Sequence, residues 1–252
     1  MINLKGIQSF CQECGACSAS VECQDLQPDE DLIQLIAEQV LTTLGKQPSV
    51  DTGEAVSENG MPKIPLGVSN RHMHIRKDTF HQLFGPDVEL SSYRDLYQPG
   101  EFAAEQVVTI VGPKMRSIQN VRILGPYRDY DQIELSLTDA IGLGIHPPIR
   151  NSGDLHDAAP LTIAGPKGSV FLQKCAIVAN RHVHMAPRHA QKFGVQDGDY
   201  CKIHIGGDKP TTFEKVLVRV RAGWKLQMHL DTDDANAADV RCNVMADFIE
   251  KM

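Results

Sequence analysis

The sequence predicts a mainly β fold of two small β-barrel domains from an internal duplication, with short helices and an N-terminal amphipathic helix. Three observations lead to this fold class. The pattern Asn-Arg-His-x-His occurs at residues 70–74 and again at 180–184, each time directly after an apolar, strand-like run. Short apolar runs alternate with glycine and proline turns in both halves. A short helix pattern follows each histidine pair, and such a repeated order of elements is expected of a duplicated unit.

The strands are predicted from short apolar runs bounded by turn residues. A strand–turn–strand unit built around Gly-Pro-Lys occurs once in each half, at residues 107–111, 112–114 and 121–124, and at 161–164, 165–168 and 170–172. Strands this short and numerous most simply close into two small barrels, because closure removes exposed sheet edges.

Short helices are predicted after the histidine pairs, at residues 77–84 and 187–193. Gly85 and Gly194 follow these segments, and glycine commonly ends a helix because it tolerates a left-handed backbone. Pro187 fits the first position of the second helix. The order of strand, histidine pair, helix and glycine therefore occurs twice.

The chain is long enough for more than one hydrophobic core. Its 252 residues are 42% hydrophobic and 23% charged, an ordinary globular composition. We divide it into an N-terminal extension at 1–62, a first barrel half at 63–175 and a second at 176–252. The strand at 64–70 is a candidate to pack with the second half, so these ranges are halves of the sequence rather than fixed spatial units.

Composition excludes several classes of protein. The chain has no unbroken apolar run of about 18 residues, so we expect no membrane span. Its formal net charge of −7 argues against a general nucleic-acid binder, which would carry a basic surplus. Seven cysteines without a secretory signal favour a reduced, cytoplasmic compartment.

The N-terminal extension contains a predicted amphipathic helix and a linker. Apolar residues recur at three- and four-residue spacing from Ile33 to Leu44, between a helix start at Pro28 and a stop at Gly45. A helix this short is marginal alone in water, so it docks either onto its own domain or onto another protein. The small and polar residues at 47–54 read as a linker.

The extension also carries a cysteine motif, Cys-x2-Cys-x2-Cys-x5-Cys, formed by Cys11, Cys14, Cys17 and Cys23. This spacing is compatible with zinc or an iron–sulfur cluster, but its last interval departs from the familiar cluster pattern. Reduced thiols on a tail are the alternative. We leave these cysteines out of the active site.

The histidine pairs point to metal chemistry. Side chains alternate along a strand, so His72 and His74 project from one face, and His182 and His184 do the same. Imidazoles on one face can reach a single ion at about 2.0–2.1 Å. Hydrogen-bonded strand histidines are the alternative for one pair alone. Repetition in the same frame favours a mono- or dinuclear, zinc-type site between the two halves.

Two further residues are candidates to complete such a site. Glu134 lies on the polar face of a predicted strand, and His229 lies on the polar face of another. A solvated strand face is the alternative for either residue alone. The same alternation points Arg71 and Arg181 away from the histidines and toward carboxylates of the barrels, which gives both arginines a structural role.

Longer motifs resemble the phosphate propanoyltransferase family, the PduL-type phosphotransacylases. They cover about residues 63 to 240 in the expected order. The motifs are Gly67 to His74, Asp95 to Glu105, Leu124-Gly125-Pro126-Tyr127-Arg128, Ser152-Gly153-Asp154, Arg181 to His184, and Met228 to Asn236.

This resemblance implies two β-barrel domains with a dinuclear zinc site between them. It assigns one Zn²⁺ to His72, His74 and Glu134, and the other to His182, His184 and His229; another divalent metal is the alternative. It also implies that Arg128 binds phosphate and acts catalytically, because a planar guanidinium suits a tetrahedral oxyanion. Gln98 is implied to bind substrate near the same pocket.

The implied activity interconverts acyl-CoA plus phosphate with acyl phosphate plus CoA, for a propanoyl or acetyl chain. The resemblance further implies a homodimer inside a bacterial microcompartment, as in propanediol degradation, with the N-terminal helix bound to a shell protein. A dinuclear zinc hydrolase acting on thioesters or amides is the main alternative. A non-catalytic microcompartment protein braced by its metals is the third.

Overall fold

The computed structural model describes residues 55–57 and 60–252. The predicted helix at 28–45, the linker at 47–54 and the cysteine motif at 11–23 lie outside these residues. In the part of the chain that the structure describes, no helix has the length and apolar content needed to cross a lipid bilayer.

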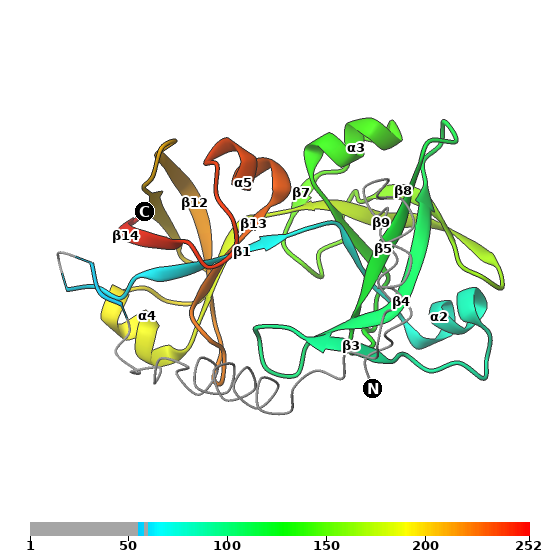
Figure 1. The fold of residues 1–252 in the computed structure, drawn as a ribbon, viewed down its shortest axis with the longest axis horizontal. Helices are drawn as coiled ribbons and strands as arrows, with labels where there is room; N and C mark the ends of the chain where they lie inside the picture. Colours follow the sequence, from blue (N-terminus) through cyan, green and yellow to red (C-terminus); the bar gives the residue numbers. More distant parts are fainter. Residues whose placement is uncertain (1–54, 58–59) are drawn as a thin grey trace, which may run out of the picture. The chain divides into compact units, whose positions relative to one another are not determined.

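One six-stranded barrel is built from β1 and the C-terminal strands, in the closed order β1-β13-β10-β12-β11-β14 (Figure 1). Its strands are β1 (Ile64–Ser69), β10 (His182–Met185), β11 (Tyr200–Ile205), β12 (Thr211–Val220), β13 (Gln227–Asp231) and β14 (Met245–Lys251). We call it the second barrel.

The first barrel holds the remaining strands, in the sheet order β3-β4-β5-β2-β6-β9-β7. Strand β8 pairs with both β4 and β9, which closes a ring of six strands and leaves β3 and β7 at its margins. The strands are β2 (His72–His74), β3 (Ser92–Asp95), β4 (Phe102–Val111), β5 (Ser117–Gly125), β6 (Gln132–Leu135), β7 (Ile149–Arg150), β8 (Ala159–Ala164) and β9 (Ser169–Ala179).

Four short helices occur in the described residues. They are α2 (Lys77–Phe84), α3 (Leu137–Leu143), α4 (Pro187–Phe193) and α5 (Thr232–Ala237). Helices α2 and α4 have the predicted bounds. Helix α4 ends at Gly194, whose φ of 66° is left-handed, which explains the glycine there. Helix α3 begins with the Ser136 side chain accepting a hydrogen bond from the Asp139 backbone.

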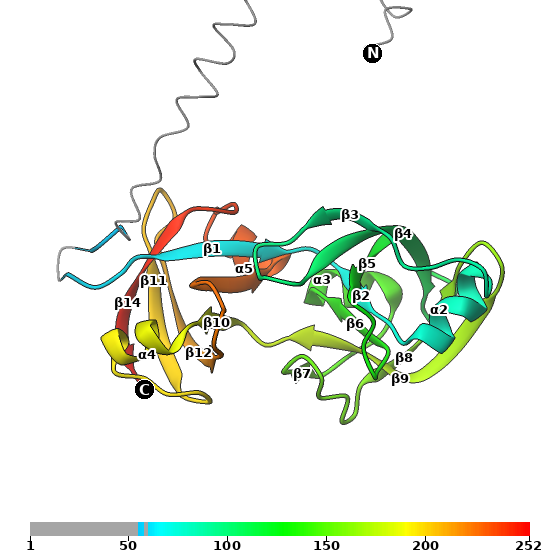
Figure 2. The same cartoon turned by 90° about the horizontal axis from the view of Figure 1, so that it is seen from below.

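The chain crosses between the barrels twice. Strand β1 lies in the second barrel and leads to β2 in the first, and β9 leads back from the first barrel to β10 (Figures 1 and 2). Residue 175, the boundary between the sequence halves, falls within β9. Both crossings run directly into a His-x-His strand, so the histidine pairs lie where the two barrels meet.

Each barrel has its own apolar core, and the residue between each pair of histidines belongs to it. Met73 lies fully buried in the first core with Ile133, and Val183 lies fully buried in the second core with Met228. Because neighbouring side chains on a strand point to opposite faces, the histidines on either side of Met73 and Val183 point out of the barrels. The predicted fold, mainly β with two barrels, is confirmed.

Candidate metal centre

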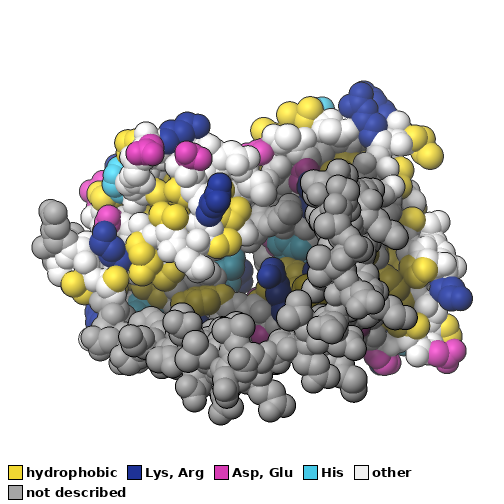
Figure 3. Space-filling view, in the orientation of Figure 1, with side chains coloured by type: hydrophobic (Ala, Val, Ile, Leu, Met, Phe, Trp, Pro, Cys, Tyr) yellow, Lys and Arg dark blue, Asp and Glu magenta, His cyan; other side chains and the backbone are white. Residues whose placement is uncertain are grey.

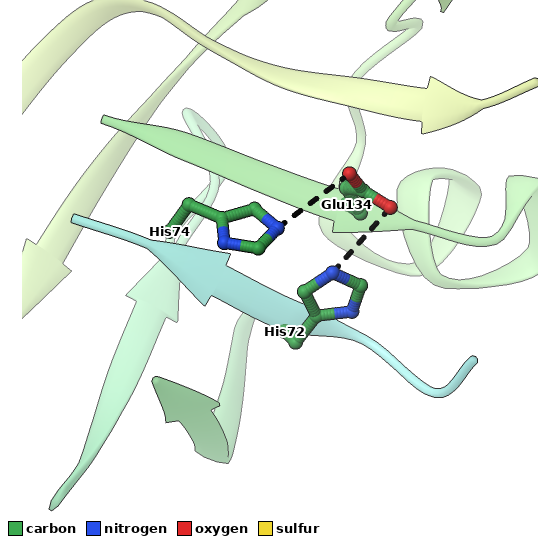
Figure 4. A group of neighbouring side chains, drawn as sticks. All are labelled: His72, His74 and Glu134. Atoms are coloured by element: carbon green, nitrogen blue, oxygen red, sulfur yellow. Dashed lines mark ion pairs between the residues drawn. The ribbon is translucent and has the colours of Figure 1, made fainter. Parts of the chain in front are cut away.

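In the first barrel, strand register brings three candidate ligands together. Strand β2 pairs antiparallel with β6, which sets His72 opposite Glu134. His72 Nε2 lies 3.4 Å from Glu134 Oε2, and His74 Nε2 lies 3.9 Å from Glu134 Oε1. Figure 4 shows both imidazoles and the carboxylate turned toward one another from these two strands. All three side chains are buried.

This arrangement fits a metal ion. The ligand atoms of His72, His74 and Glu134 all lie within 4.8 Å of one another. Ligands about 2.0–2.1 Å from a tetrahedral zinc lie roughly 3.3 Å apart, so small side-chain adjustments are sufficient. Glu134 is buried, so the alternative that it lies on a solvated strand face is wrong.

In the second barrel, the same register brings three histidines together. Strand β10 pairs antiparallel with β13, which sets His182 opposite His229 and His184 opposite Gln227. The ring centroids of these histidines are 4.7 Å apart for His182 and His184, 5.0 Å for His182 and His229, and 4.8 Å for His184 and His229. The second predicted ligand set is therefore also a spatial cluster.

A buried glutamine lies beside the third residue of each cluster. Gln132 donates a hydrogen bond from Nε2 to Glu134 Oε1 at 2.7 Å. At the equivalent place in the second barrel, Gln227 Oε1 lies 2.9 Å from His229 Nε2. Gly67 makes room for this contact, because a Cβ there would lie 2.9 Å from the Gln227 side chain. Both glutamines therefore orient a candidate ligand.

The first histidine of each pair is fixed by a backbone carbonyl. His72 Nδ1 donates to the carbonyl of Asn70 at 2.8 Å, and His182 Nδ1 donates to that of Asn180 at 2.9 Å. A carbonyl can only accept, so the proton is on Nδ1 and Nε2 is left as the lone-pair atom. This is the outer-shell contact that metal-binding histidines commonly make.

The two clusters face one pocket. It is lined by residues from β1, the two strand crossings, β6 and β13, and its lining includes four of the six candidate ligands, which are His72, Glu134, His182 and His229. Figure 3 shows histidine side chains at the bottom of a hollow between the barrels. The possible metal-binding group of the first barrel and the histidine cluster of the second therefore lie beside the same pocket.

Electrostatics keeps the candidate ligands in the forms that bind metal. Burial, followed by the charge of His72, lowers the pKa of His74 to about 3. Burial, followed by the charge of His182, lowers the pKa of His184 to about 2 and that of His229 to about 3. These imidazoles are neutral at pH 7. Burial raises the pKa of Glu134, but His72, His74, His182 and a hydrogen bond from Ser152 together more than offset it and leave this pKa lowered, so Glu134 is ionised.

Arg128 lies near the first cluster. Its guanidinium pairs with Glu101 at 2.9 Å, and its Nε has no hydrogen-bond partner among the described residues although it is buried. Its charge is one of the smaller contributions that lower the pKa of His74, after burial and His72. An anion beside this cluster would therefore find an unsatisfied donor.

Gln98 forms hydrogen bonds with the backbone of the other barrel. Its side chain is 2% exposed, and its amide forms two hydrogen bonds with the backbone of Lys225, from Nε2 to the carbonyl oxygen at 3.1 Å and from the Lys225 N–H to Oε1 at 3.0 Å. Lys225 lies two residues before β13 of the second barrel. Gln98 thus joins the two barrels.

The two arginines next to the histidines form the ion pairs that were predicted. Arg71 pairs with Asp139 at 2.7 Å and Arg181 pairs with Asp234 at 3.3 Å. Each aspartate lies in the helix after the strand that carries the third candidate ligand, which repeats the same brace in both barrels. The prediction that both arginines point toward carboxylates of the barrels is confirmed.

Sequence reasoning missed Trp224, which stacks on His184 with ring centroids 4.1 Å apart. It also missed the backbone carbonyls of Asn70 and Asn180 as histidine partners. A signal for the tryptophan was present, because it is the only one in the chain and lies three residues before Gln227. The asparagines were part of the repeated motif, but their carbonyls carry no sequence signal.

Comparisons with known proteins agree with these observations. The family model described as phosphate propanoyltransferase matches residues 65–241. A phosphate propanoyltransferase of Lachnoclostridium phytofermentans is 45% identical over 214 residues, covering 85% of this chain and 96% of that protein. One of Thermotoga maritima is 48% identical over 178 residues, covering 70% of this chain and 84% of that protein.

A third relative, the phosphate propanoyltransferase of Clostridioides difficile, is 38% identical over 222 residues, covering 88% of this chain and 99% of that protein. The resemblance noted from the motifs is therefore confirmed. With these relatives, the two-barrel chain is placed among the acyltransferase enzymes. The chain belongs to the phosphate propanoyltransferase family.

Proposed function

We propose that this protein is a phosphate acyltransferase that interconverts short-chain acyl-CoA and phosphate with acyl phosphate and CoA at a dinuclear zinc site. The observation that carries the proposal is one pocket lined by ligands from both clusters, in a chain of this family. Propanoyl is the acyl group in the names of its relatives. Acetyl remains an alternative, because one methylene changes binding by only about 1–3 kcal/mol.

The ligand chemistry supports two zinc ions. The first cluster offers two imidazoles and a carboxylate, and the second offers three imidazoles; three protein ligands with a fourth position open is the usual pattern of a catalytic zinc site. When bound, the two ions would supply positive charge that polarises the thioester carbonyl and neutralises phosphate.

The residues of the chain then perform the remaining tasks. Arg128 holds phosphate beside the first cluster through donors that Glu101 does not use. A phosphate oxygen forms a bond to the thioester carbonyl carbon, the carbon–sulfur bond breaks, and CoA leaves as the thiolate. Holding both anions in one pocket offsets the repulsion that separates them in water.

Direct attack by phosphate requires no cysteine nucleophile. Burial raises the pKa of the Cys175 and Cys201 thiols to about 12, so both are protonated at neutral pH and act as packing residues.

Product analysis separates this proposal from hydrolysis. The purified full chain is mixed with propanoyl-CoA, and free CoA thiol is followed with and without phosphate. We expect thiol release that depends on phosphate, together with propanoyl phosphate as product. Equal release without phosphate would instead establish a zinc hydrolase. A protein with neither activity that unfolds when its metal is removed would fit the metal-braced, non-catalytic role.

The N-terminal extension has a separate proposed task. The amphipathic stripe from Ile33 to Leu44 binds a shell protein and places the enzyme in a bacterial microcompartment within the cytoplasm. Deleting residues 1–46 is expected to preserve phosphate-dependent turnover and to abolish co-sedimentation with shell particles. Loss of folding after this deletion would instead show that the helix docks onto the enzyme itself. The homodimer implied by the resemblance is tested by light scattering of both forms.

A further inference from the structure

Trp224 lies against a candidate metal ligand. It is the single tryptophan of the chain and follows β12 in the second barrel. Its ring stacks on the imidazole of His184, with centroids 4.1 Å apart and planes inclined by 22°. A stack of two aromatic rings restricts the planes of both and adds about 0.5–1.5 kcal/mol beyond the area it buries.

His184 has a particular need for such support. It is buried, and neither of its ring nitrogens has a hydrogen-bond partner among the residues that the structure describes. His182, on the same strand, is fixed by the Asn180 carbonyl. No hydrogen bond from the described part of the chain sets the rotation of the His184 ring, and its contact with Trp224 at 4.1 Å is closer than its contacts with His182 at 4.7 Å and His229 at 4.8 Å. The flat face of the indole therefore constrains where its nitrogens point.

The indole is itself held on the second barrel. The guanidinium carbons of Arg219 and Arg221 lie 5.5 and 5.9 Å from the centroid of its ring. Arg219 is also the β12 residue in register with His184 on β10. The tryptophan is thus attached to the strand beside the histidine that it supports.

Residues of the first barrel contact Lys225, which follows Trp224 in the sequence. Gln98, between β3 and β4, forms its two hydrogen bonds with the backbone of Lys225, and Lys225 Nζ lies 4.9 Å from the ring centroid of Tyr97. Because both polar groups of the Gln98 amide are used, the loop that carries Trp224 is anchored from the opposite barrel. The counterpart of this stack in the first barrel is looser, since the ring of Tyr130 lies edge-on to His74 at 6.4 Å.

We propose that Trp224 is a positioning residue that orients His184 toward the metal of the second cluster, and that Gln98 acts through Trp224 from the other barrel. The inference rests on the proposed two-metal function. It assigns Gln98 to the assembly of the metal site, in place of the substrate contact that the resemblance implies.

The test measures zinc binding by the full-length protein rather than turnover. Zinc stoichiometry and affinity are determined by competition with a chromophoric chelator for wild type, Trp224→Ala, Trp224→Phe and Gln98→Ala. Loss of a residue that orients a metal ligand typically weakens binding about 10- to 100-fold. We expect Trp224→Ala to weaken one of two zinc ions by roughly tenfold or more and Gln98→Ala by a smaller factor, with the other ion unchanged.

Two controls separate orientation from a general loss of packing. Trp224→Phe keeps an aromatic face and is expected to restore zinc affinity to within about threefold of wild type. Phe171→Ala removes a 61% exposed aromatic ring from β9 in the first barrel and is expected to leave both zinc affinities unchanged. In wild type, Co²⁺ is expected to quench the tryptophan emission as it binds the second cluster, because the indole lies against His184.

The outcomes distinguish this inference from the proposed function. Two zinc ions bound by Trp224→Ala with wild-type affinity would overturn the inference and leave the two-metal function intact. If Trp224→Ala fails to fold, Gln98→Ala provides the test. Zinc affinities and Co²⁺ quenching equal to those of wild type would overturn the role of Gln98. Wild-type protein that binds fewer than two zinc ions would overturn the proposed function and this inference with it.

Discussion

The two barrels build one arrangement with a single change of ligand type. His72 faces Glu134 in the first barrel, and His182 faces His229 in the second. A divalent ion in the first cluster would be partly neutralised by the carboxylate, whereas an ion among three neutral imidazoles would keep its full charge. The two barrels therefore share one geometry but provide two electrostatic environments. The proposed reaction uses both, since it must hold phosphate and polarise a thioester.

The largest expected effect comes from removing the residue that distinguishes the clusters. Glu134→Ala and His229→Ala are each expected to lose one of two zinc ions and to lower kcat/KM by roughly 10³-fold or more, because metal charge stabilises the transition state by several kcal/mol. Metal analysis and the thiol-release assay measure both effects.

Exchanging the ligand types sharpens this comparison. Glu134→His and His229→Glu preserve three ligands in each cluster, so we expect two zinc ions in both variants with activity altered less than in the alanine variants. If either alanine variant kept wild-type turnover with one zinc ion, the need for both clusters would be contradicted.

The second largest expected effect is on phosphate binding. Each barrel has an arginine shortly after one of its strands, Arg128 in the first and Arg221 in the second. The backbone N–H of Arg128 donates to the Ile75 carbonyl at 3.0 Å, and the backbone N–H of Arg221 donates to the Met185 carbonyl at 3.1 Å. The two arginines therefore occupy equivalent backbone positions in the two barrels. We expect Arg128→Ala to raise the phosphate KM or lower kcat by about 10²- to 10³-fold, and Arg221→Ala by only a few fold. Initial rates over a phosphate series separate the two parameters.

Arg128→Lys keeps the charge but loses the planar donors, so we expect partial activity from it. Equal phosphate KM and kcat in Arg128→Ala and wild type would remove Arg128 from the proposed mechanism.

The fold and both ligand clusters were predictable because they depend on repeated local patterns. The motif at 70–74 and 180–184 predicts a strand whose histidines share one face, followed by a short helix. The resemblance assigns Glu134 and His229 as the remaining ligands. Alternation alone gave the opposite of the true environment for Glu134, because its polar face points into a buried pocket rather than to solvent.

What could not be predicted depends on contacts between distant segments. Gln98 is 127 residues from Lys225, and Trp224 is 40 residues from His184, so no periodicity links either pair. Strand β1 was only a candidate for the second half, because its pairing with β13 and β14 joins residues more than 150 positions apart. Such contacts are set by how the barrels close, which a local pattern does not encode.

The pH dependence of stability is the third expected effect, measured on metal-free protein. The folded pKa is lowered from 6.5 to about 3 for His74 and His229 and to about 2 for His184, mainly by burial. Below pH 6.5 the unfolded chain therefore binds more protons, so the free energy of unfolding falls as pH falls toward about 3. We expect the free energy of unfolding to fall through this window by on the order of a few kcal/mol in total, and the urea midpoint to decrease with it.

The second barrel should contribute more of this dependence of the free energy of unfolding on pH, since burial lowers the pKa of all three histidines in its cluster. His184→Gln is therefore expected to flatten the dependence at least as much as His74→Gln. A urea midpoint that does not change between pH 6.5 and 4 would contradict neutral, buried histidines in the folded state.

The smallest expected effect compares the two braces. Arg71→Ala leaves Asp139 without its partner, with the aspartate side chain only 14% exposed, and is expected to destabilise the protein by about 1–3 kcal/mol. Arg181→Ala breaks a longer contact of 3.3 Å to a carboxylate that is 24% exposed, so we expect about 1 kcal/mol. Urea unfolding at pH 7 measures both. A larger loss in Arg181→Ala would reverse the proposed order.

The central claim is that two separate ligand clusters serve one pocket with two metal ions. Anomalous scattering at the zinc edge, from crystals grown with zinc and soaked in phosphate, tests it most directly. We expect two zinc peaks, one bound by His72, His74 and Glu134 and the other by His182, His184 and His229, with phosphate between the barrels near Arg128. A single peak, or zinc bound away from both clusters, would contradict the claim.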